Sequence, residues 1–100
     1  MSNILNSEGY AVAIMGEDGR VKNMGGTVIG RVSAAAEVFT ATGDKAGRYD
    51  STGQVYDEFG KHAGTIHSDG KVYDIKNRYI GKADGAHIES GGAALLLLVR

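Results

Sequence analysis

The chain contains no cysteine and no proline among its 100 residues. Without cysteine it has no disulfide framework, no thiolate nucleophile and no cysteine-ligated metal. Proline would remove a ladder hydrogen bond from a strand, so its absence suits a protein made of tightly paired strands. The turns of such a protein must be built from other residues, and glycine supplies 16 of the 100 positions.

The sequence also lacks an excess of charge of one sign, and it lacks long apolar runs. The net charge is −1, with both signs scattered along the chain, which argues against a nucleic-acid surface because that surface needs a basic stripe. Leu95–Val99 is a run of consecutive large apolar residues, and it is far shorter than the ~20 residues that span a bilayer. No secretory signal is visible at the N-terminus, so we expect a cytoplasmic location.

Motifs that carry chemistry are scarce. A glycine-rich phosphate loop, a calcium-binding loop and a G-x-S-x-G elbow are all absent from the sequence. His62, His67 and His87 do not have the spacing of metal ligands on one helix face, and we interpret them as surface side chains. The aspartates recur mostly in turns, and nothing singles out one catalytic pair. We therefore expect no enzymatic activity, no cofactor and no metal.

What the sequence does contain is a repeat of 17 residues. One column of the repeat holds valine, a second holds glycine, and a third holds a turn residue that is either glycine or asparagine. Their members are Val21, Val38, Val55 and Val72; Gly30, Gly47, Gly64 and Gly81; and Gly26, Gly43, Gly60 and Asn77. Self-similarity at a fixed short period indicates a stacked or ring-shaped repeat architecture.

Each copy of the repeat has the pattern of a β-hairpin. Lys71–Asp74 alternates polar and apolar residues, which is typical of a half-buried strand. Asn77 stands where the other copies have glycine, so this column predicts a left-handed turn position. Gly81 lies inside the returning strand and predicts a bulge or a close approach of another backbone. Asp-Gly pairs such as Asp69-Gly70 then predict the turn into the next copy.

The same register runs through the rest of the chain. Ile4 precedes Val21 by 17 residues, so the N-terminus is a copy that begins at its first strand. Residues 9–15 are nearly all apolar, which predicts a strand that is central in the sheet or covered on both faces. Residues 33–37 are rich in alanine, but the repeat keeps step across them, so we interpret them as a turn. The whole chain, residues 1–100, is predicted to be one all-β domain. The predicted core residues are Val21, Val38, Val55, Val72, Ile29, Ile66 and Ile80.

The last segment, residues 86–100, reads as a degenerate copy of the repeat. Its leucine run predicts a strand, since short apolar runs bounded by turn signals are typical of buried strands. One alternative is a strand buried within the chain against residues 10–15, and the other is an intersubunit strand in a homo-oligomer. The second makes Leu95, Leu96, Leu97, Leu98 and Val99 candidate interface residues.

Tyrosines gather in the third and fourth copies. Tyr56 and Tyr73 occupy equivalent positions next to the valine column, so both lie on the opposite face of their strands. They predict either an aromatic shelf for a small ligand such as a sugar ring, or cross-strand aromatic contacts that stabilise neighbouring hairpins.

The pattern D-G-x-V-x-D-x-x-G-x-x-I-G-x, clearest at residues 69–82 and 18–31, resembles the tandem hairpin repeats of the small bacterial β-flower proteins. The presence of four in-register copies resembles the four-fold version of that family. The resemblance implies hairpins arranged around a pseudo-rotational axis, in a flower- or propeller-like ring. It implies no assigned activity and no catalytic residues.

The predicted fold is therefore a ring of tandem hairpins, closed by the N- and C-terminal strands. The predicted function is that of a non-enzymatic structural or interaction protein that associates with itself. The alternative is a small-ligand binding module that uses Tyr56 and Tyr73.

Overall fold

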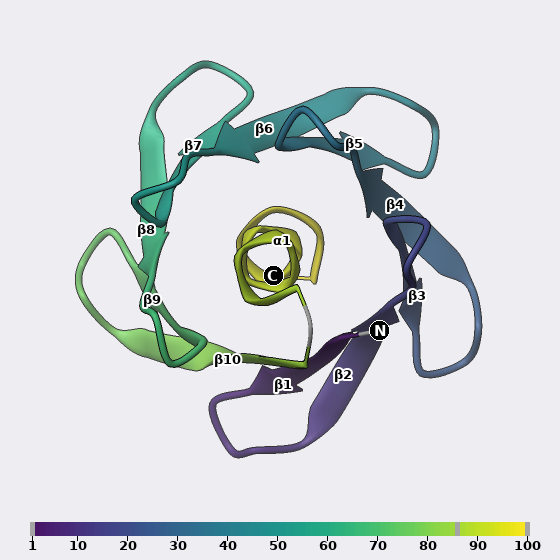
Figure 1. Cartoon of the computed structure of the whole chain (residues 1–100), viewed down its shortest axis with the longest axis horizontal. Helices are drawn as coiled ribbons and strands as arrows, with labels where there is room; N and C mark the ends of the chain where they lie inside the picture. Colours follow the sequence, from purple (N-terminus) through teal and green to yellow (C-terminus); the bar gives the residue numbers. More distant parts are fainter. Residues whose placement is uncertain (1, 86, 100) are drawn as a thin grey trace.

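The computed structural model describes residues 2–85 and 87–99. Over these residues ten antiparallel strands form a closed barrel around one short helical segment (Figure 1). The strands are β1 (Ser2–Asn6), β2 (Ala11–Met15), β3 (Arg20–Asn23), β4 (Val28–Val32), β5 (Glu37–Thr40), β6 (Lys45–Tyr49), β7 (Gln54–Asp57), β8 (His62–Ile66), β9 (Lys71–Asp74) and β10 (Tyr79–Gly85). The helical segment consists of α1 (Ile88–Ala94) and the π-helix η1 (Leu95–Val99).

Successive strands pair in chain order, and β1 pairs with β10 to close the ring. The predicted all-β fold of tandem hairpins is thereby confirmed. The described residues form five hairpins rather than four, because β1 and β2 make a complete hairpin ahead of the four full copies. Below, hairpins 1 to 5 are numbered in chain order. The closing strand is Tyr79–Gly85, not the leucine run.

The hairpin turns have the predicted backbone. Asn77 has a φ of 64°, and Gly26, Gly43 and Gly60, at the same place in the other copies, have φ between 82° and 94°. This is the left-handed region, in which glycine and asparagine are the favoured residues. The asparagine-for-glycine exchange in this column therefore identified the turn position correctly.

A further repeat column, the second Asp in the pattern D-G-x-V-x-D, begins each hairpin turn, and the sequence alone assigned it no role. Its side-chain oxygen accepts hydrogen bonds from backbone N–H groups in the turn that follows. Asp57, for example, accepts from the N–H groups of Phe59 and Lys61, both at 2.9 Å. The members are Asn6, Asn23, Thr40, Asp57 and Asp74. Asn, Asp and Thr can all accept these hydrogen bonds, so no single residue type is repeated in every copy of the column.

The connections between hairpins also contain a left-handed residue, and in one of them it is an alanine. Gly19 has a φ of 85°, whereas Ala36 occupies the equivalent position with a φ of 64°. The hydrogen bond from the next strand is longer there, 3.1 Å from Tyr49 N to Ala36 O against 2.8 Å from Val32 N to Gly19 O. Ala36 thus keeps the turn at the cost of backbone strain.

Ala36→Gly is expected to raise the free energy of unfolding by about 1 kcal/mol, because glycine occupies the left-handed region without a Cβ penalty. Urea unfolding followed by circular dichroism measures the change. The reverse substitution, Gly19→Ala, is the matched comparison and is expected to destabilise, since its Cβ would lie 2.2 Å from the carbonyl oxygen of Val32. A loss of stability in Ala36→Gly would contradict the assignment of strain.

The core follows the valine column as predicted. The inward residues of the first strand of each hairpin are completely buried; they are Ile4, Val21, Val38, Val55 and Val72. Ile66 is buried too, whereas Ile29 and Ile80 are half-buried and pack against this core. In the returning strands the inward positions are held by Gly30 and Gly81, and the isoleucine before each glycine lies at a β-bulge, where the register of the pairing shifts.

Of the two alternatives for residues 9–15, β2 is a central strand, between β1 and β3, and is not covered on both faces. Ala13 and Met15 face the interior, whereas Tyr10 lies in the hairpin turn and is 67% exposed. Residues 33–37 form a turn that leads into β5, as predicted.

The leucine run is a helix and not a strand. It lies on the axis of the ring, with α1 before it (Figure 1). The pairing of β1 with β10 leaves no edge within the described barrel to which another strand could be added. A helix pairs its backbone groups within itself, so it fills an apolar interior without unpaired N–H and C=O groups. This closure of the ring is the physical reason that the strand prediction failed.

Along the axis, large side chains of the helix face glycines of the barrel wall. Leu95, Leu96, Leu97 and Leu98 face Gly81, Gly64, Gly47 and Gly30, in that order. A Cβ added at any of these glycines would lie 2.6 to 2.8 Å from the facing leucine side chain. Earlier in the helix the arrangement is the opposite: the helix contributes a glycine, Gly92, and the wall contributes the large side chain of Ile66 that packs on it.

Consecutive leucines therefore contact consecutive hairpins. Each residue of an α-helix turns by about 100°, and a π-helix, with more residues per turn, turns by less. Neighbouring hairpins of a five-fold ring are about 72° apart, so the wider helix brings successive leucines to hairpins 5, 4, 3 and 2 more closely than an α-helix does. The π-helical geometry of Leu95–Val99 is explained by this match.

Candidate functional site

The interior of the barrel is filled by the chain itself. Leu95 is 2% exposed and Leu96 is 9% exposed, and the described residues leave no buried side-chain N or O atom without a partner. Both leucines are enclosed by the barrel and lie away from any surface that a second copy could reach. Leu97, Leu98 and Val99 are partly exposed at the end of the helix. Candidate sites must be sought on the outer surface.

Tyr56 and Tyr73 lie on the outer wall, on β7 and β9. They are separated by β8, so about two strand spacings, roughly 10 Å, lie between their backbones. The Tyr56 ring has the guanidinium of Arg48 4.3 Å from its centroid. Tyr73 lies beside the rings of His67 and Tyr79, with centroids 4.6 and 5.7 Å away. The two tyrosines thus make separate cross-strand contacts, and the structure does not bring them together as one shelf.

The three histidines lie apart. His62 packs beside Tyr56 with ring centroids 5.8 Å apart, and His67 packs on Tyr73. His87 precedes α1, and its backbone N–H donates to the Oγ of the buried Ser2 at 2.8 Å. Within residues 2–85 and 87–99, no group of His, Asp and Glu side chains is arranged to hold a metal ion.

A polar cleft of about 310 Å³ lies where α1 enters the barrel. Its most specific contact joins the Tyr49 hydroxyl to the Ser90 hydroxyl at 2.7 Å, between β6 and the helix. The other copies hold aliphatic residues at the place of Tyr49, such as Val32 and Ile66. This single hydroxyl in an apolar column is the signal that could have located the cleft from the sequence. The bond ties the helix to the wall.

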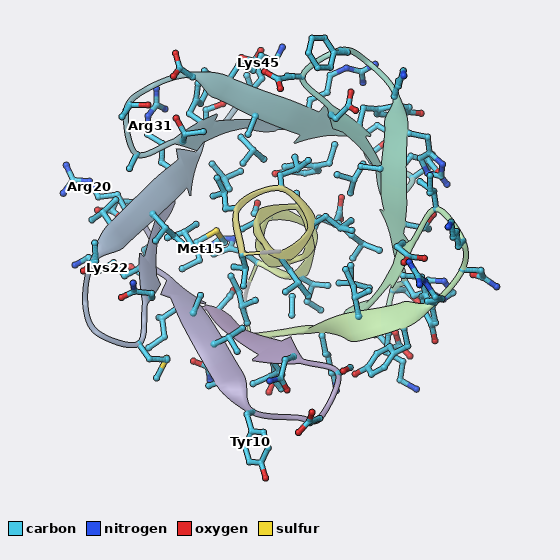
Figure 2. All side chains as sticks on the ribbon, turned by 180° about the vertical axis from the view of Figure 1, so that it is seen from behind. Tyr10, Met15, Arg20, Lys22, Arg31 and Lys45 are labelled. Carbon is cyan, nitrogen blue, oxygen red and sulfur yellow. The ribbon has the colours of Figure 1, made fainter. Side chains whose placement is uncertain are left out.

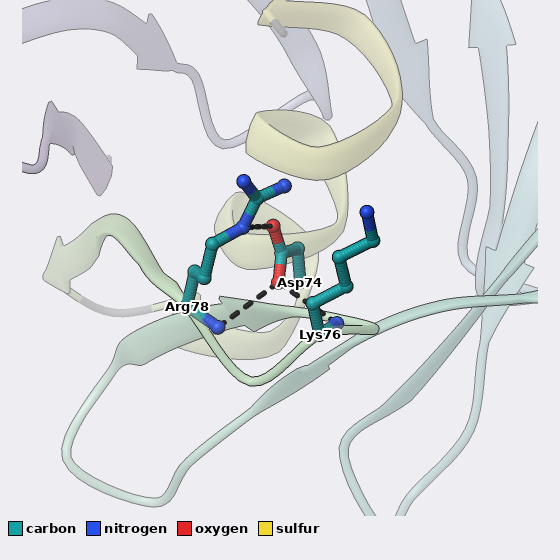
Figure 3. Close-up of polar contacts among 3 residues, drawn as sticks. All are labelled: Asp74, Lys76 and Arg78. Atoms are coloured by element: carbon teal, nitrogen blue, oxygen red, sulfur yellow. Dashed lines mark hydrogen bonds and ion pairs between the residues drawn. The ribbon is translucent and has the colours of Figure 1, made fainter.

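One acidic side chain is held in a turn by several donors at once. Asp74, which is buried, accepts from the backbone N–H groups of Arg78 and Lys76 and from Arg78 Nε, each at 2.9 Å (Figure 3). The backbone N–H of Arg78, followed by its side chain and the N–H of Lys76, lowers the pKa of the Asp74 carboxyl below its usual value, while burial opposes the shift. The arrangement stabilises the last hairpin turn.

The Asp74 carboxylate is expected to make folding stability depend on pH. Because its pKa is lowered in the folded state, its contribution is present above the unfolded pKa of about 3.9 and is lost as the pH falls through the folded pKa. Asp74→Asn keeps an acceptor in the turn, as Asn6 does in hairpin 1. It should therefore be less stable than the wild type at neutral pH and approach it in acid.

Urea unfolding at a series of pH values measures this difference. The control is Asp57→Asn, at the equivalent place in hairpin 4, where Asp57 receives the same two backbone donors. A gap between Asp74→Asn and the wild type that stays constant from neutral pH into acid would contradict the role of the charge.

Apolar side chains are exposed at the tips of four hairpins. Tyr10, Met24, Phe59 and Ile75 are 67%, 57%, 80% and 62% exposed. They occupy three columns of the repeat, and only Met24 and Ile75 share one, so no common packing requirement places all four there. The tip of hairpin 3 has the small residue Ala41 in the column of Met24 and Ile75. The tips project outward from the ring, as the labelled Tyr10 does (Figure 2).

No protein-family model, no curated protein and no solved structure matches the chain. The described part of the chain also contains no helix that is long and apolar enough to cross a membrane.

Proposed function

We propose that the protein is a non-enzymatic interaction module that associates with itself through its hairpin tips. The observation that carries the proposal is the exposure of a large apolar side chain on four of the five described tips. Exposed apolar surface that serves no packing role within a chain marks interaction sites. Of the leucine run that the sequence suggests as the interface, Leu95 and Leu96 are enclosed by the barrel, so the proposal assigns the contact to the tips.

Symmetry favours a second copy as the partner. The tips are distributed around the ring, so they are too far apart to converge on a small ligand (Figure 1). A second ring carries tips at the same spacing, and two self-complementary surfaces can form a closed dimer. The turns that hold the tips are fixed by hydrogen bonds from backbone N–H groups to a side-chain oxygen of the same turn, as at Asp57, so little conformational entropy is lost on association.

Native mass spectrometry on the full chain tests the proposal. The wild type is expected at a multiple of 10.5 kDa, and the variant with serine at Tyr10, Met24, Phe59 and Ile75 is expected as a monomer with an unchanged fold. The control carries four substitutions in the exposed connecting loops, namely Ala34→Ser, Ala35→Ser, Ser51→Ala and Ser68→Ala, and should stay associated. A monomeric wild type, or a tip variant that still associates, would overturn the proposal.

The same proposal places the chain among the β-flower proteins, as a five-hairpin member. Its support is the ring of tandem hairpins around a central axis, together with the repeat pattern at residues 18–31 and 69–82. A bacterial origin and a cytoplasmic location belong to this proposal.

A further inference from the structure

The outer wall of hairpin 1 differs from the rest of the barrel. Leu5 and Ile14 face outward there and are partly exposed. Leu5 stands directly opposite Lys82 of β10, and Ile14 stands directly opposite Lys22 of β3. In hairpins 3 and 4 the position of Leu5 is held by an aromatic residue, which pairs with an arginine of the preceding strand. Phe39, for example, stands opposite Arg31.

The hairpins on both sides of this wall place like charges opposite each other. Lys71 is opposite Lys82 in hairpin 5, and Arg20 is opposite Arg31 in hairpin 2. Directly opposed like charges destabilise a sheet. The same repeat positions in hairpin 3 hold Glu37 and Arg48, a favourable pair, so the fold accommodates opposite charges at these positions.

The cations have only weak partners within the chain. Arg20 Nε lies 3.7 Å from a carboxylate oxygen of Asp18, and Lys71 Nζ lies 3.9 Å from one of Asp69. About half or more of each of these four side chains is exposed to solvent. Exposed pairs at such distances contribute little. Among the described residues, Lys22 and Lys82 form no ion pair. Arg20, Lys22 and Arg31 extend outward from the ring (Figure 2).

These residues make up one surface, the hairpin-1 wall. It consists of an apolar centre, Leu5 and Ile14, with Lys71 and Lys82 on one side and Arg20 and Lys22 on the other. Asp84 lies at its edge, opposite Asn3, and is the one carboxylate among its outward strand residues. The cations are scattered along the sequence, and only the closure of β1 on β10 brings them to both sides of hairpin 1.

We infer that the hairpin-1 wall binds an acidic amphipathic helix of a partner protein. Such a helix has an apolar stripe flanked by carboxylates, which is the complement of a strip flanked by lysines. The dimensions agree, because three strand spacings, about 14 Å, separate Lys82 from Lys22, and a helix is about 10–12 Å across.

The fold disfavours the other occupants of this wall. An extended segment would need a free strand edge for main-chain pairing, and the described barrel has closed its edges. A flat bilayer touches a convex wall along a narrow line and so reaches few of the flanking cations at once. This inference concerns a different face from the tips, and it stands whether or not the copies associate.

Two synthetic helical peptides serve as probes. They share one apolar stripe and differ only in the flanking residues, glutamate in one and lysine in the other. Fluorescence anisotropy with the full chain at low salt is expected to show binding of the glutamate peptide at least about tenfold tighter than of the lysine peptide. Added salt should weaken the preferred complex because the flanking charges are exposed.

Charge reversal on the protein supplies the decisive variant. Lys22→Glu with Lys82→Glu should invert the preference, so that the lysine peptide now binds more tightly. Lys82→Glu also places a carboxylate opposite Lys71, so the fold should be retained. The control, Lys61→Glu with Lys76→Glu at the tips, carries the same change in net charge and should keep the wild-type preference.

Each result decides the inference. Inversion by the wall variant, with no inversion by the control, supports it. Failure of the wild type to bind the glutamate peptide, or an unchanged preference in the wall variant, would overturn it. Binding to phosphatidylserine vesicles without any preference between the peptides would overturn the choice of partner and replace it by a lipid surface.

Discussion

Gly64→Ala is expected to lower the free energy of unfolding by about 3 kcal/mol, at the upper end of what overpacking costs. The new Cβ would lie 2.4 Å from the carbonyl oxygen of Tyr73 and 2.8 Å from the Cδ atoms of Leu96. The backbone atom cannot move without shifting β9, and the leucine is held inside the ring. Urea unfolding followed by circular dichroism measures the loss.

A control and a double variant isolate the cause. Gly25→Ala lies in an open hairpin turn, where the nearest atom is a side-chain oxygen at 3.4 Å, and it should change stability by less than about 0.5 kcal/mol. Combining Gly64→Ala with Leu96→Ala should cost less than the sum of the two single changes, by about 1 kcal/mol, because the shortened side chain makes room for the methyl group. Strict additivity would sink the claim that this leucine and glycine pack together.

Leu95→Asp is expected to unfold the protein at room temperature. Its side chain is almost completely buried against Gly81, and an unpaired carboxylate there costs more than about 5 kcal/mol, comparable to the whole stability of many domains. Circular dichroism and the dispersion of amide signals in an NMR spectrum report the loss of fold.

Two further aspartate variants set the scale for this effect. Leu98→Asp, near the partly exposed end of the helix, should be destabilised but folded, and Ile75→Asp, at an exposed tip, should match the wild type in stability. If Leu95→Asp folded as well as Ile75→Asp, the helix could not be the core of the barrel.

The repeat was sufficient to predict the hairpins because their turns depend on local chemistry. Asn77 and the glycines of its column adopt left-handed backbone wherever they occur in a tight turn, so the sequence carries that information directly. The burial of the valine column follows from period-two alternation in the same way.

The tail could not be predicted in this way, since its structure depends on an event elsewhere in the chain. A run such as Leu95–Val99 suits a strand or a helix equally well. The choice is made by the pairing of β1 with β10, residues about eighty positions apart in sequence, which removes the free edge and leaves an interior to be filled. Ile29 packs against the core but is only partly buried, because it lies at the β-bulge next to Gly30, and the position of Gly30 is the one that faces Leu98.

The candidate sites were less predictable than the fold. Tyr56 and Tyr73 share a column, but the sequence does not show that β8 separates them. The hairpin-1 wall combines residues from both ends of the chain, and its cations are scattered along the sequence. Only the closed ring defines which of them are neighbours.

The contact of four successive leucines with hairpins 5, 4, 3 and 2 limits how this protein can evolve. Linear repeat arrays gain or lose a unit by gene duplication with little effect on the remaining units. Here a duplicated 17-residue unit would add two strands and widen the ring, and the existing helix would no longer reach the wall on every side. A change in repeat number would have to be accompanied by a new C-terminal segment, so descendants with other repeat numbers are separated from this one by an unstable intermediate.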